Sequence, residues 1–209
     1  IKPILVLILL TTLIPELFTA STSITAFQSP AVIWGYFMGY GVAILFLREI
    51  ATSFSLNYGG IFILGMAYSF FNEGFLAKTY LIFHDDPVNK LINLPVDFLA
   101  DLGNFFGLNF GFTITSALWH GMGSVLIPIC IVHYLYPQSA TTPWLNKWVT
   151  GVLGVLLAFA GTTTFFGPEK IQGTMNIYMV IVTCMAFLFI LSLKFKNDMN
   201  TFFNPPISK

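Results

Sequence analysis

Glu73 and His120 are the residues of this sequence best placed to do chemistry. Each lies inside a long apolar run, the glutamate in 58–83 and the histidine in 108–136. At about 1.5 Å of rise per residue, they fall roughly 15 and 18 Å from the helix ends that the intervening connection joins. Because consecutive membrane-spanning helices are antiparallel and usually adjacent, we expect the two side chains to lie at similar depth and within reach of each other.

An ionisable group in the membrane interior is expensive to bury, so it marks a candidate functional site. A carboxylate beside an imidazole can act as general acid and base or exchange a proton, and the histidine could also ligate haem iron or bond a quinone. The alternative is a structural pair that holds two helices together. We take Glu73 and His120 as the candidate catalytic residues.

Polar residues near this pair are candidate binding residues. Asn72 precedes Glu73, Lys78 lies five residues beyond it, and Ser124 follows His120 by one helical turn. Pro128 has no N–H, so it should leave a backbone carbonyl free about one turn back, near Ser124. Close packing of helices through small residues is the alternative interpretation.

A second charged pair, Arg48 and Glu49, follows the apolar run 31–47. At the edge of a membrane such side chains usually extend to water. A salt bridge inside the bundle is the sharper alternative, and we add both residues to the candidate binding set.

No metal site is predicted, and the cofactor stays unknown. Cys130 and Cys184 both lie inside apolar runs, and their spacing suits neither a disulfide framework nor a metal site. The motif His84-Asp85-Asp86 is interpreted as a solvated turn. The sequence also lacks HExxH, GxSxG and a phosphate-binding glycine-rich loop.

Composition determines the class of protein that must position these residues. The chain has 209 residues, of which 56% are hydrophobic and 9% are charged, and its mean hydropathy is +0.80. Soluble domains carry about 25% charged residues, so lipid must cover most of this surface. The net charge of zero gives no case for nucleic acid. The expected partners are the lipid bilayer and other membrane subunits.

The fold class predicted is all-α: a polytopic transmembrane helical bundle of about six spans. Each span needs roughly 20 apolar residues. The six runs are 3–18, 31–47, 58–83, 108–136, 148–166 and 175–193. The first also has features of a signal peptide, but Pro15 and Glu16 precede any plausible cleavage site, so a first spanning helix is preferred. We expect one domain over 1–199 and a C-terminal tail over 200–209.

Lysine and arginine counts predict the orientation. One side of the membrane carries six of these residues and the other carries three, which places both termini in the cytoplasm. The two sets are Lys2, Arg48, Lys147, Lys194, Lys196 and Lys209 against Lys78, Lys90 and Lys170.

The connection between the third and fourth predicted spans has a helical pattern of its own. After Pro95, apolar residues recur at helical spacing with polar residues opposite, which predicts a short helix lying in the membrane interface. Its apolar positions are Val96, Leu99, Leu102 and Phe106, and Asp97, Asp101 and Asn104 face the other way. A helix packed on the mouth of the bundle is the alternative.

Four short motifs resemble a group of uncharacterised prokaryotic multi-pass membrane proteins over residues 13–137. They are Pro15-Glu16-Leu17-Phe18-Thr19-Ala20-Ser21-Thr22, Leu47-Arg48-Glu49, Asn72-Glu73-Gly74 with Lys78, and His120-Gly121-Met122-Gly123-Ser124 with Pro128. The resemblance implies membrane residence and no particular activity.

A more distant similarity is to the CAAX-protease and bacteriocin-processing intramembrane endopeptidases. Those helical bundles carry an EExxxR motif and later histidine motifs, which Asn72-Glu73 and Ser116-xxx-His120 resemble in part. The similarity implies that Glu73 and His120 would activate water against a peptide bond. The departures are Asn72 at the key glutamate, Ala77 at the arginine, Ser116 at the aromatic position and Pro137 four residues after His133.

Three functions are compatible with the sequence. We favour a non-enzymatic component or subunit of a membrane assembly with a buried Glu/His site. A divergent glutamate/histidine intramembrane protease would need both side chains within reach of one water. A small-molecule, proton or ion pathway would need a continuous polar lining from Glu16 or Lys78 inward to Arg48.

Overall fold

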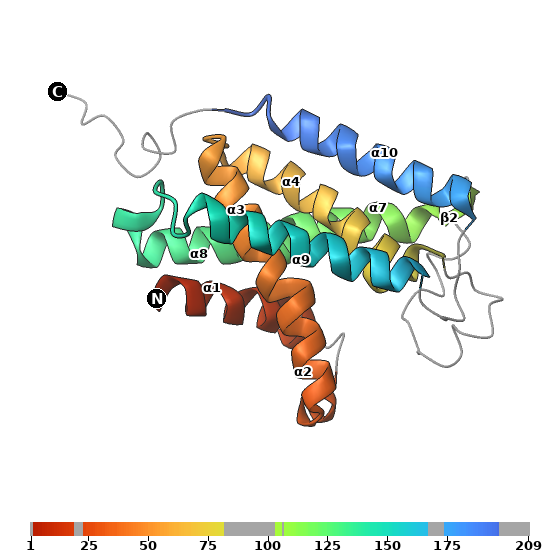
Figure 1. Cartoon of the computed structure of the whole chain (residues 1–209), viewed down its shortest axis with the longest axis horizontal. Coiled ribbons are helices and arrows are strands. Elements are labelled where there is room, and N and C mark those ends of the chain that lie inside the picture. The colour runs from red at the N-terminus through yellow and green to blue at the C-terminus, as the bar shows by residue number, and fades with distance from the viewer. Residues whose placement is uncertain (1, 19–22, 82–102, 106, 167–173, 197–209) are drawn as a thin grey trace.

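The structure is a computed structural model that describes residues 2–18, 23–81, 103–105, 107–166 and 174–196. Most of the described residues lie in helices (Figure 1). The longer ones are α1 (Lys2–Leu13), α2 (Pro30–Tyr36), α3 (Ala43–Ser53), α4 (Tyr58–Phe71), α7 (Phe110–Trp119), α8 (Ile127–Leu135), α9 (Lys147–Phe166) and α10 (Met175–Ser192). The π-helical segments η1 (Ile14–Phe18), η3 (Phe37–Val42), η4 (Asn72–Leu76) and η6 (His120–Leu126) continue or join them. Short 3-10 turns are η2 (Ile24–Gln28), η5 (Thr79–Leu81) and η7 (Pro137–Ser139).

Four helices in the described residues are long and apolar enough to cross a membrane. They are Pro30–Ser53, Phe110–Leu135, Lys147–Phe166 and Met175–Ser192. This confirms the predicted all-α, membrane-spanning character. The remaining two predicted spans correspond to α1–η1 and α4–η4, which are not among the four, so the count of six stays a prediction.

α4 occupies the centre of the bundle, and the polar residues Asn72 and Glu73 follow it in η4. It packs against α10, η6, α7 and α3, and eight of its fourteen residues are buried. In α9, by contrast, only Leu157 and Gly161 are buried. A helix surrounded by protein needs less apolar surface than one that faces lipid, so Asn72 and Glu73 are tolerated at its end.

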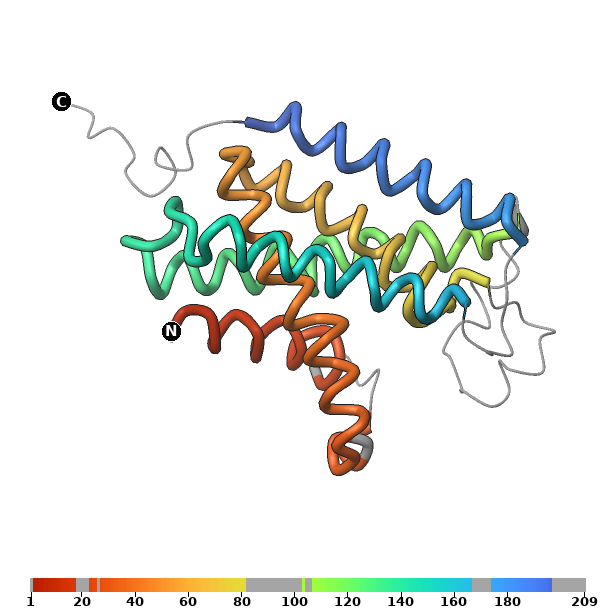
Figure 2. The backbone as a smooth tube through the Cα atoms, in the orientation of Figure 1, coloured from red at the N-terminus to blue at the C-terminus, as the bar shows by residue number. Residues whose placement is uncertain are grey.

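Helices that follow one another along the chain run in opposite directions, except for the strongly tilted helix α2–η3–α3. In Figures 1 and 2 the N-terminal end of α1 and the C-terminal end of α10 lie at the same end of the bundle. The continuous helix α2–η3–α3 crosses the others steeply, and α2 projects from the bundle (Figure 1). The cytoplasmic location of the termini stays a prediction, as does the boundary between a domain over 1–199 and a tail.

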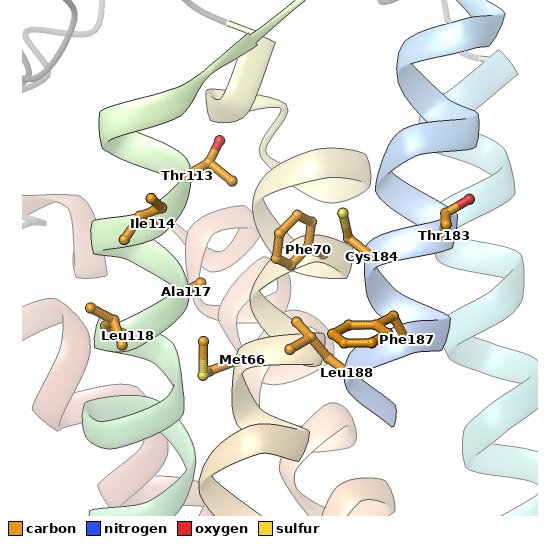
Figure 3. A pocket seen from close by; sticks show the side chains of 10 residues that line it. All are labelled: Met66, Phe70, Thr113, Ile114, Ala117, Leu118, Thr183, Cys184, Phe187 and Leu188. Carbon is orange, nitrogen blue, oxygen red and sulfur yellow. The ribbon is translucent and has the colours of Figure 1, made fainter. Parts of the chain in front are cut away.

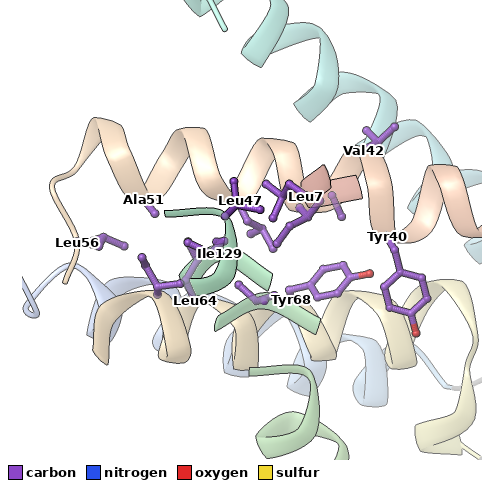
Figure 4. Packing of buried hydrophobic residues seen from close by; sticks show 14 of the residues in the cluster. Leu7, Tyr40, Val42, Leu47, Ala51, Leu56, Leu64, Tyr68 and Ile129 are labelled. Carbon is purple, nitrogen blue, oxygen red and sulfur yellow. The ribbon is translucent and has the colours of Figure 1, made fainter. Parts of the chain in front are cut away.

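The larger cluster of buried apolar side chains fills the space between α1, α3, α4 and α8. Leu7, Leu47, Leu64 and Ile129 are among its members (Figure 4). Tyr40 and Tyr68 lie at one edge of the cluster, and Ala51 and Leu56 lie at the opposite edge (Figure 4). The cluster therefore separates the bundle interior near the two tyrosines from the end at which α3 stops.

The predicted interfacial helix falls mostly outside the described residues. Its predicted C-terminal part is wrong, because Asn104–Phe105 forms strand β1, which pairs antiparallel with β2 (Leu108–Asn109). Gly103 and Gly107 flank this part with φ angles of +103° and +85°. These left-handed values end any helix there and turn the chain into a hairpin. Asn109 then caps α7 by accepting a hydrogen bond from the amide of Phe112.

Candidate functional site

Glu73 and His120 meet in the interior of the bundle. The Glu73 Oε1 lies 2.7 Å from the His120 Nε2, and the two side chains are 11% and 4% exposed. The glutamate lies in η4 and the histidine is the first residue of η6. The structure thus brings together, in direct contact, the two residues that the sequence singled out.

A close crossing of α4 and η6 makes this contact possible. A Cβ atom added to Gly65 would lie 2.8 Å from the Gly121 Cα and 2.9 Å from the Val125 Cβ. No side chain fits at such distances, so glycine is required at this position. Small residues of this kind let two membrane helices approach closely enough for polar side chains to pair.

Each polar atom of the pair has a partner from the protein. Asn72 donates from Nδ2 to the Glu73 Oε1 at 2.9 Å, and the Thr79 hydroxyl donates to the Glu73 Oε2. On the far side of the imidazole, the Ser124 Oγ lies 2.9 Å from the His120 Nδ1. Asn72 and Ser124, two of the candidate binding residues, therefore contact the pair.

A further polar contact supports Ser124 from α1. The Thr11 hydroxyl donates to the Ser124 backbone carbonyl. Pro128 has no N–H to offer that carbonyl, as the sequence led us to expect. Thr11 replaces the missing donor and ties α1 to the helix that carries His120.

Two tyrosines enclose the imidazole. Tyr40 stacks on it with ring centroids 6.0 Å apart, and Tyr68 meets it edge-on at 5.7 Å. The Tyr68 hydroxyl donates to the Gly39 carbonyl at 2.7 Å, whereas the Tyr40 hydroxyl is hydrogen-bonded to the Glu16 carboxylate. Stacking of this kind limits the orientations of the histidine ring.

The site is built from π-helical segments. Glu16 lies in η1, Tyr40 in η3, Glu73 in η4, and His120 with Ser124 in η6. Single π-helical turns inside α-helices are rare, and they occur frequently at functional sites. Four of them converging on one polar cluster mark this region as specialised.

Lys78, another predicted binding residue, is buried at the start of the turn after η4. It adopts a left-handed backbone conformation, with φ at 57°. Its ammonium group donates to the Thr164 carbonyl at 2.7 Å, near the C-terminal end of α9. A cation is favourable at a helix C-terminus. Lys78 therefore anchors this turn to α9.

Arg48 and Glu49 lie in a separate buried cluster, and the expectation that they extend to water is wrong. Each is 1% exposed, and the Arg48 Nη1 lies 2.7 Å from the Glu49 Oε1. The guanidinium stacks 3.8 Å from the centre of the Trp144 ring, and Glu49 accepts from the Trp144 amide at 3.1 Å. Arg48 Nη2 also donates to the carbonyls of Ser139, Ala140 and Thr142.

Arg48 and Glu49 are buried because of the connection between α8 and α9, whose carbonyls and amides have few backbone partners of their own. The two side chains supply those partners, and these charge-assisted hydrogen bonds stabilise the residues more than contact with water would. This placement favours a structural role for the two residues.

Four residues of the site were not predicted from the sequence. Glu16 was named only as one end of a pathway lining and not as part of the site, although its position after Pro15 inside an apolar run was a usable signal. Tyr68 precedes Asn72 by one helical turn, and Tyr40 lies between two glycines, but both also fit ordinary packing. Thr79 carried no signal, because the chain reversal after η4 brings it to Glu73.

The comparisons with known proteins identify the family. A model described as an uncharacterized membrane protein family matches residues 5–204. The chain belongs to this family. The match covers the whole polar cluster around His120 and supports residence in a lipid bilayer. No curated protein and no solved structure matches the chain.

The family assignment agrees with the first resemblance, to uncharacterised membrane proteins. It does not show the similarity to the CAAX-type proteases. Within the described residues, no three His, Cys, Asp or Glu side chains are grouped to hold a metal ion.

Proposed function

We propose that this chain is a non-enzymatic integral membrane component whose Glu73–His120 pair takes up and releases one proton. The observation that carries the proposal is the 2.7 Å contact between a carboxylate and an imidazole, both nearly inaccessible, inside a membrane protein. Ionisable residues in such positions typically serve proton relays or bind ligands.

The hydrogen bonds around the pair support this role. Asn72 and Thr79 both donate to Glu73, which suits a carboxylate that only accepts. The shared proton then belongs to the His120 Nε2. At the Nδ1, the Ser124 hydroxyl can either donate to a neutral ring or accept from a charged one, because a hydroxyl does both.

One proton at Nδ1 therefore changes the charge of the pair. Without it, the site holds a carboxylate and a neutral imidazole, with a net charge of −1. With it, the imidazolium compensates the carboxylate and the site is neutral. Rotation of the Ser124 hydroxyl is the only rearrangement that the hydrogen bonds require.

The surroundings favour a local proton site over a continuous pathway. The Glu16–Tyr40 contact extends the polar cluster as far as η1. Toward Arg48, the apolar cluster that contains Leu47, Leu64 and Ile129 intervenes (Figure 4). A pathway would need polar side chains there.

Infrared difference spectroscopy on a pH step tests the proposal. With glutamate carboxyls labelled with ¹³C, we expect the Glu73 carboxylate stretch to shift when His120 gains its proton. Glu73→Gln and His120→Gln should each remove the shift. His133→Gln is the matched control, because His133 is also buried but its ring nitrogens have no hydrogen-bond partner among the described residues. A shift that survives His120→Gln would overturn the proposal.

A further inference from the structure

The chain turns back on itself directly after η4. Lys78 takes a left-handed backbone conformation, with φ at 57°, which residues other than glycine seldom adopt. Thr79–Leu81 then forms η5, which contacts β2 and α7. Conformations such as that of Lys78 cost free energy, persist only where surrounding contacts hold them, and are concentrated at functional sites and switch regions. We call residues 77–81 the strap.

Two side chains of the strap hold it in place, one against α9 and one against the proton site. The Lys78 ammonium donates to the Thr164 carbonyl at 2.7 Å. The Thr79 hydroxyl donates to the Glu73 Oε2, whereas His120 contacts the other oxygen, Oε1. Thr79 therefore binds the carboxylate oxygen that the histidine does not contact.

Tyr80 inserts the strap into the interior of the bundle. Its side chain is buried, as is that of Leu81, and its ring meets that of Phe70 edge-on with centroids 5.4 Å apart. The Tyr80 hydroxyl lies 2.7 Å from the Ser69 Oγ, which lies 3.3 Å from the Ser116 Oγ. A buried phenol that finds a hydrogen-bond partner fixes the segment that carries it. The strap is therefore packed against α4 and α7.

A buried proton site needs an entrance for water, and the groove on the side of the bundle does not supply one. This groove lies between α4, α7 and α10 and has a volume of about 490 Å³ (Figure 3). Met66, Phe70, Leu118 and Phe187 are among the residues that line it, and none of the lining residues is charged. Apolar walls of this kind do not hold ordered water. The strap, by contrast, contacts Glu73 directly and lies at the end of the bundle where β2 lies (Figure 1).

We propose that the strap is a gate over the Glu73–His120 pair, held closed by the negative charge of the pair. This inference rests on the proposed proton site and names how that site is opened. While the pair carries its net charge of −1, the Thr79 hydroxyl bonds a carboxylate whose charge is uncompensated, and such charge-assisted hydrogen bonds are the strong ones. The proton that His120 takes up compensates this charge, so the bond weakens and the strap opens more readily.

Other ionisable side chains also face the pair or belong to the strap. They are Glu16 in η1, Tyr40 in η3, Tyr68 in α4, Cys184 in α10, and Lys78 and Tyr80 in the strap itself. Tyrosine and cysteine side chains ordinarily titrate above neutral pH. A second carboxylate can respond to pH as well, so the pH dependence is assigned to His120 through a variant that lacks the imidazole.

Time-resolved infrared spectroscopy after a downward pH jump tests the gate. In protein with ¹³C-labelled glutamate carboxyls in lipid nanodiscs, the size of the Glu73 shift reports the proton site, and its rate reports opening of the strap. Thr79→Val keeps the shape of the side chain but removes the hydroxyl. We expect the shift to persist in this variant and to develop roughly ten- to hundredfold faster, because a hydrogen bond to a charged group is lost.

Two further variants complete this test. Thr79→Ser retains the hydroxyl and should return the rate toward the wild-type value. Thr115→Val is the matched control, because the Thr115 hydroxyl bonds the Gly111 carbonyl of its own helix, and its rate should equal that of the wild type. A Thr79→Val rate equal to the wild-type rate, with the shift intact, would overturn the gate and leave the proton site standing. Absence of the shift from the wild type would overturn both.

Hydrogen–deuterium exchange measures the link between the charge of the pair and closure of the strap. We compare two pH values on either side of the infrared transition. Relative to their intrinsic rates, the amides of the strap should exchange faster at the pH at which His120 holds its proton, and His120→Gln should remove this difference. Equal protection of the strap at both pH values in the wild type, or a difference that survives His120→Gln, would overturn the role of the charge.

Discussion

The Glu73 carboxylate accepts hydrogen bonds from Asn72, Thr79 and His120. Each of these donors lowers the free energy of holding a buried carboxylate. His120 is the only one of the three that can also carry a positive charge. Removal of the histidine should therefore lower the free energy of unfolding far more than removal of the charge on the glutamate. Without His120, the Glu73 carboxylate would be a buried charge without a compensating partner.

We predict that His120→Ala lowers the free energy of unfolding by about 3–5 kcal/mol, the range for a buried pair that loses one partner. Glu73→Gln removes the charge but keeps a hydrogen-bonding side chain, so it should cost only about 1 kcal/mol. Denaturant unfolding in mixed micelles measures both.

Thr162→Val, which alters an exposed hydroxyl bonded within its own helix, is the control. If His120→Ala costs no more than this control, the pair is not a coupled unit.

At the scale of elements, the meeting of α4 with η6 positions the site. Gly65 and Gly121 let the two backbones approach closely. An added methyl group would push the helices apart or force side chains out of their preferred rotamers. The separation of Glu73 from His120 therefore depends on a residue that lies two helical turns away.

We predict that Gly65→Ala lowers the free energy of unfolding by about 1–3 kcal/mol and abolishes the infrared shift of Glu73. Gly151→Ala is the matched control, because nothing lies within 4 Å of its added Cβ atom on α9. That variant should be neutral or gain up to about 1 kcal/mol from helix propensity. Equal effects of the two variants would show that close packing of α4 and η6 does not position the pair.

The long apolar runs predicted most helices well, since a run of roughly 20 apolar residues has the length and composition of a membrane-spanning helix. They also placed Glu73 and His120 at matching depth. The π-helical segments were not predictable, because each is too short to change the pattern of apolar residues along its helix. The ends of elements were missed where glycines with positive φ end a helix, as at Gly103, and where Lys78 turns the chain after η4.

At the scale of the whole molecule, one end of the bundle is closed by Arg48 and Glu49, which hold the connection between α8 and α9. The sequence named both residues but could not show that the connection folds back over them. That contact joins segments about ninety residues apart in the chain, and no local pattern encodes it.

We predict that Arg48→Ala makes the connection 137–146 susceptible to limited proteolysis and lowers the free energy of unfolding by about 3–5 kcal/mol, because Glu49 is left buried and unpaired. The rate of cleavage measures the first effect. Lys147→Ala removes an exposed positive charge next to the same connection and should leave that rate unchanged. Protection that persists in Arg48→Ala would contradict the role assigned to this cluster.

The contact between Glu73 and His120 is central to this account, and solid-state NMR tests it most directly. In protein labelled with ¹³C at glutamate carboxyls and ¹⁵N at histidine rings, embedded in lipid bilayers, we predict a dipolar coupling between the Glu73 carboxyl carbon and the His120 Nε2. The coupling should vanish in Glu73→Gln, and the His120 Nδ1 should gain a proton as the pH falls. A wild-type protein without this coupling, or a coupling that persists in Glu73→Gln, would contradict the account.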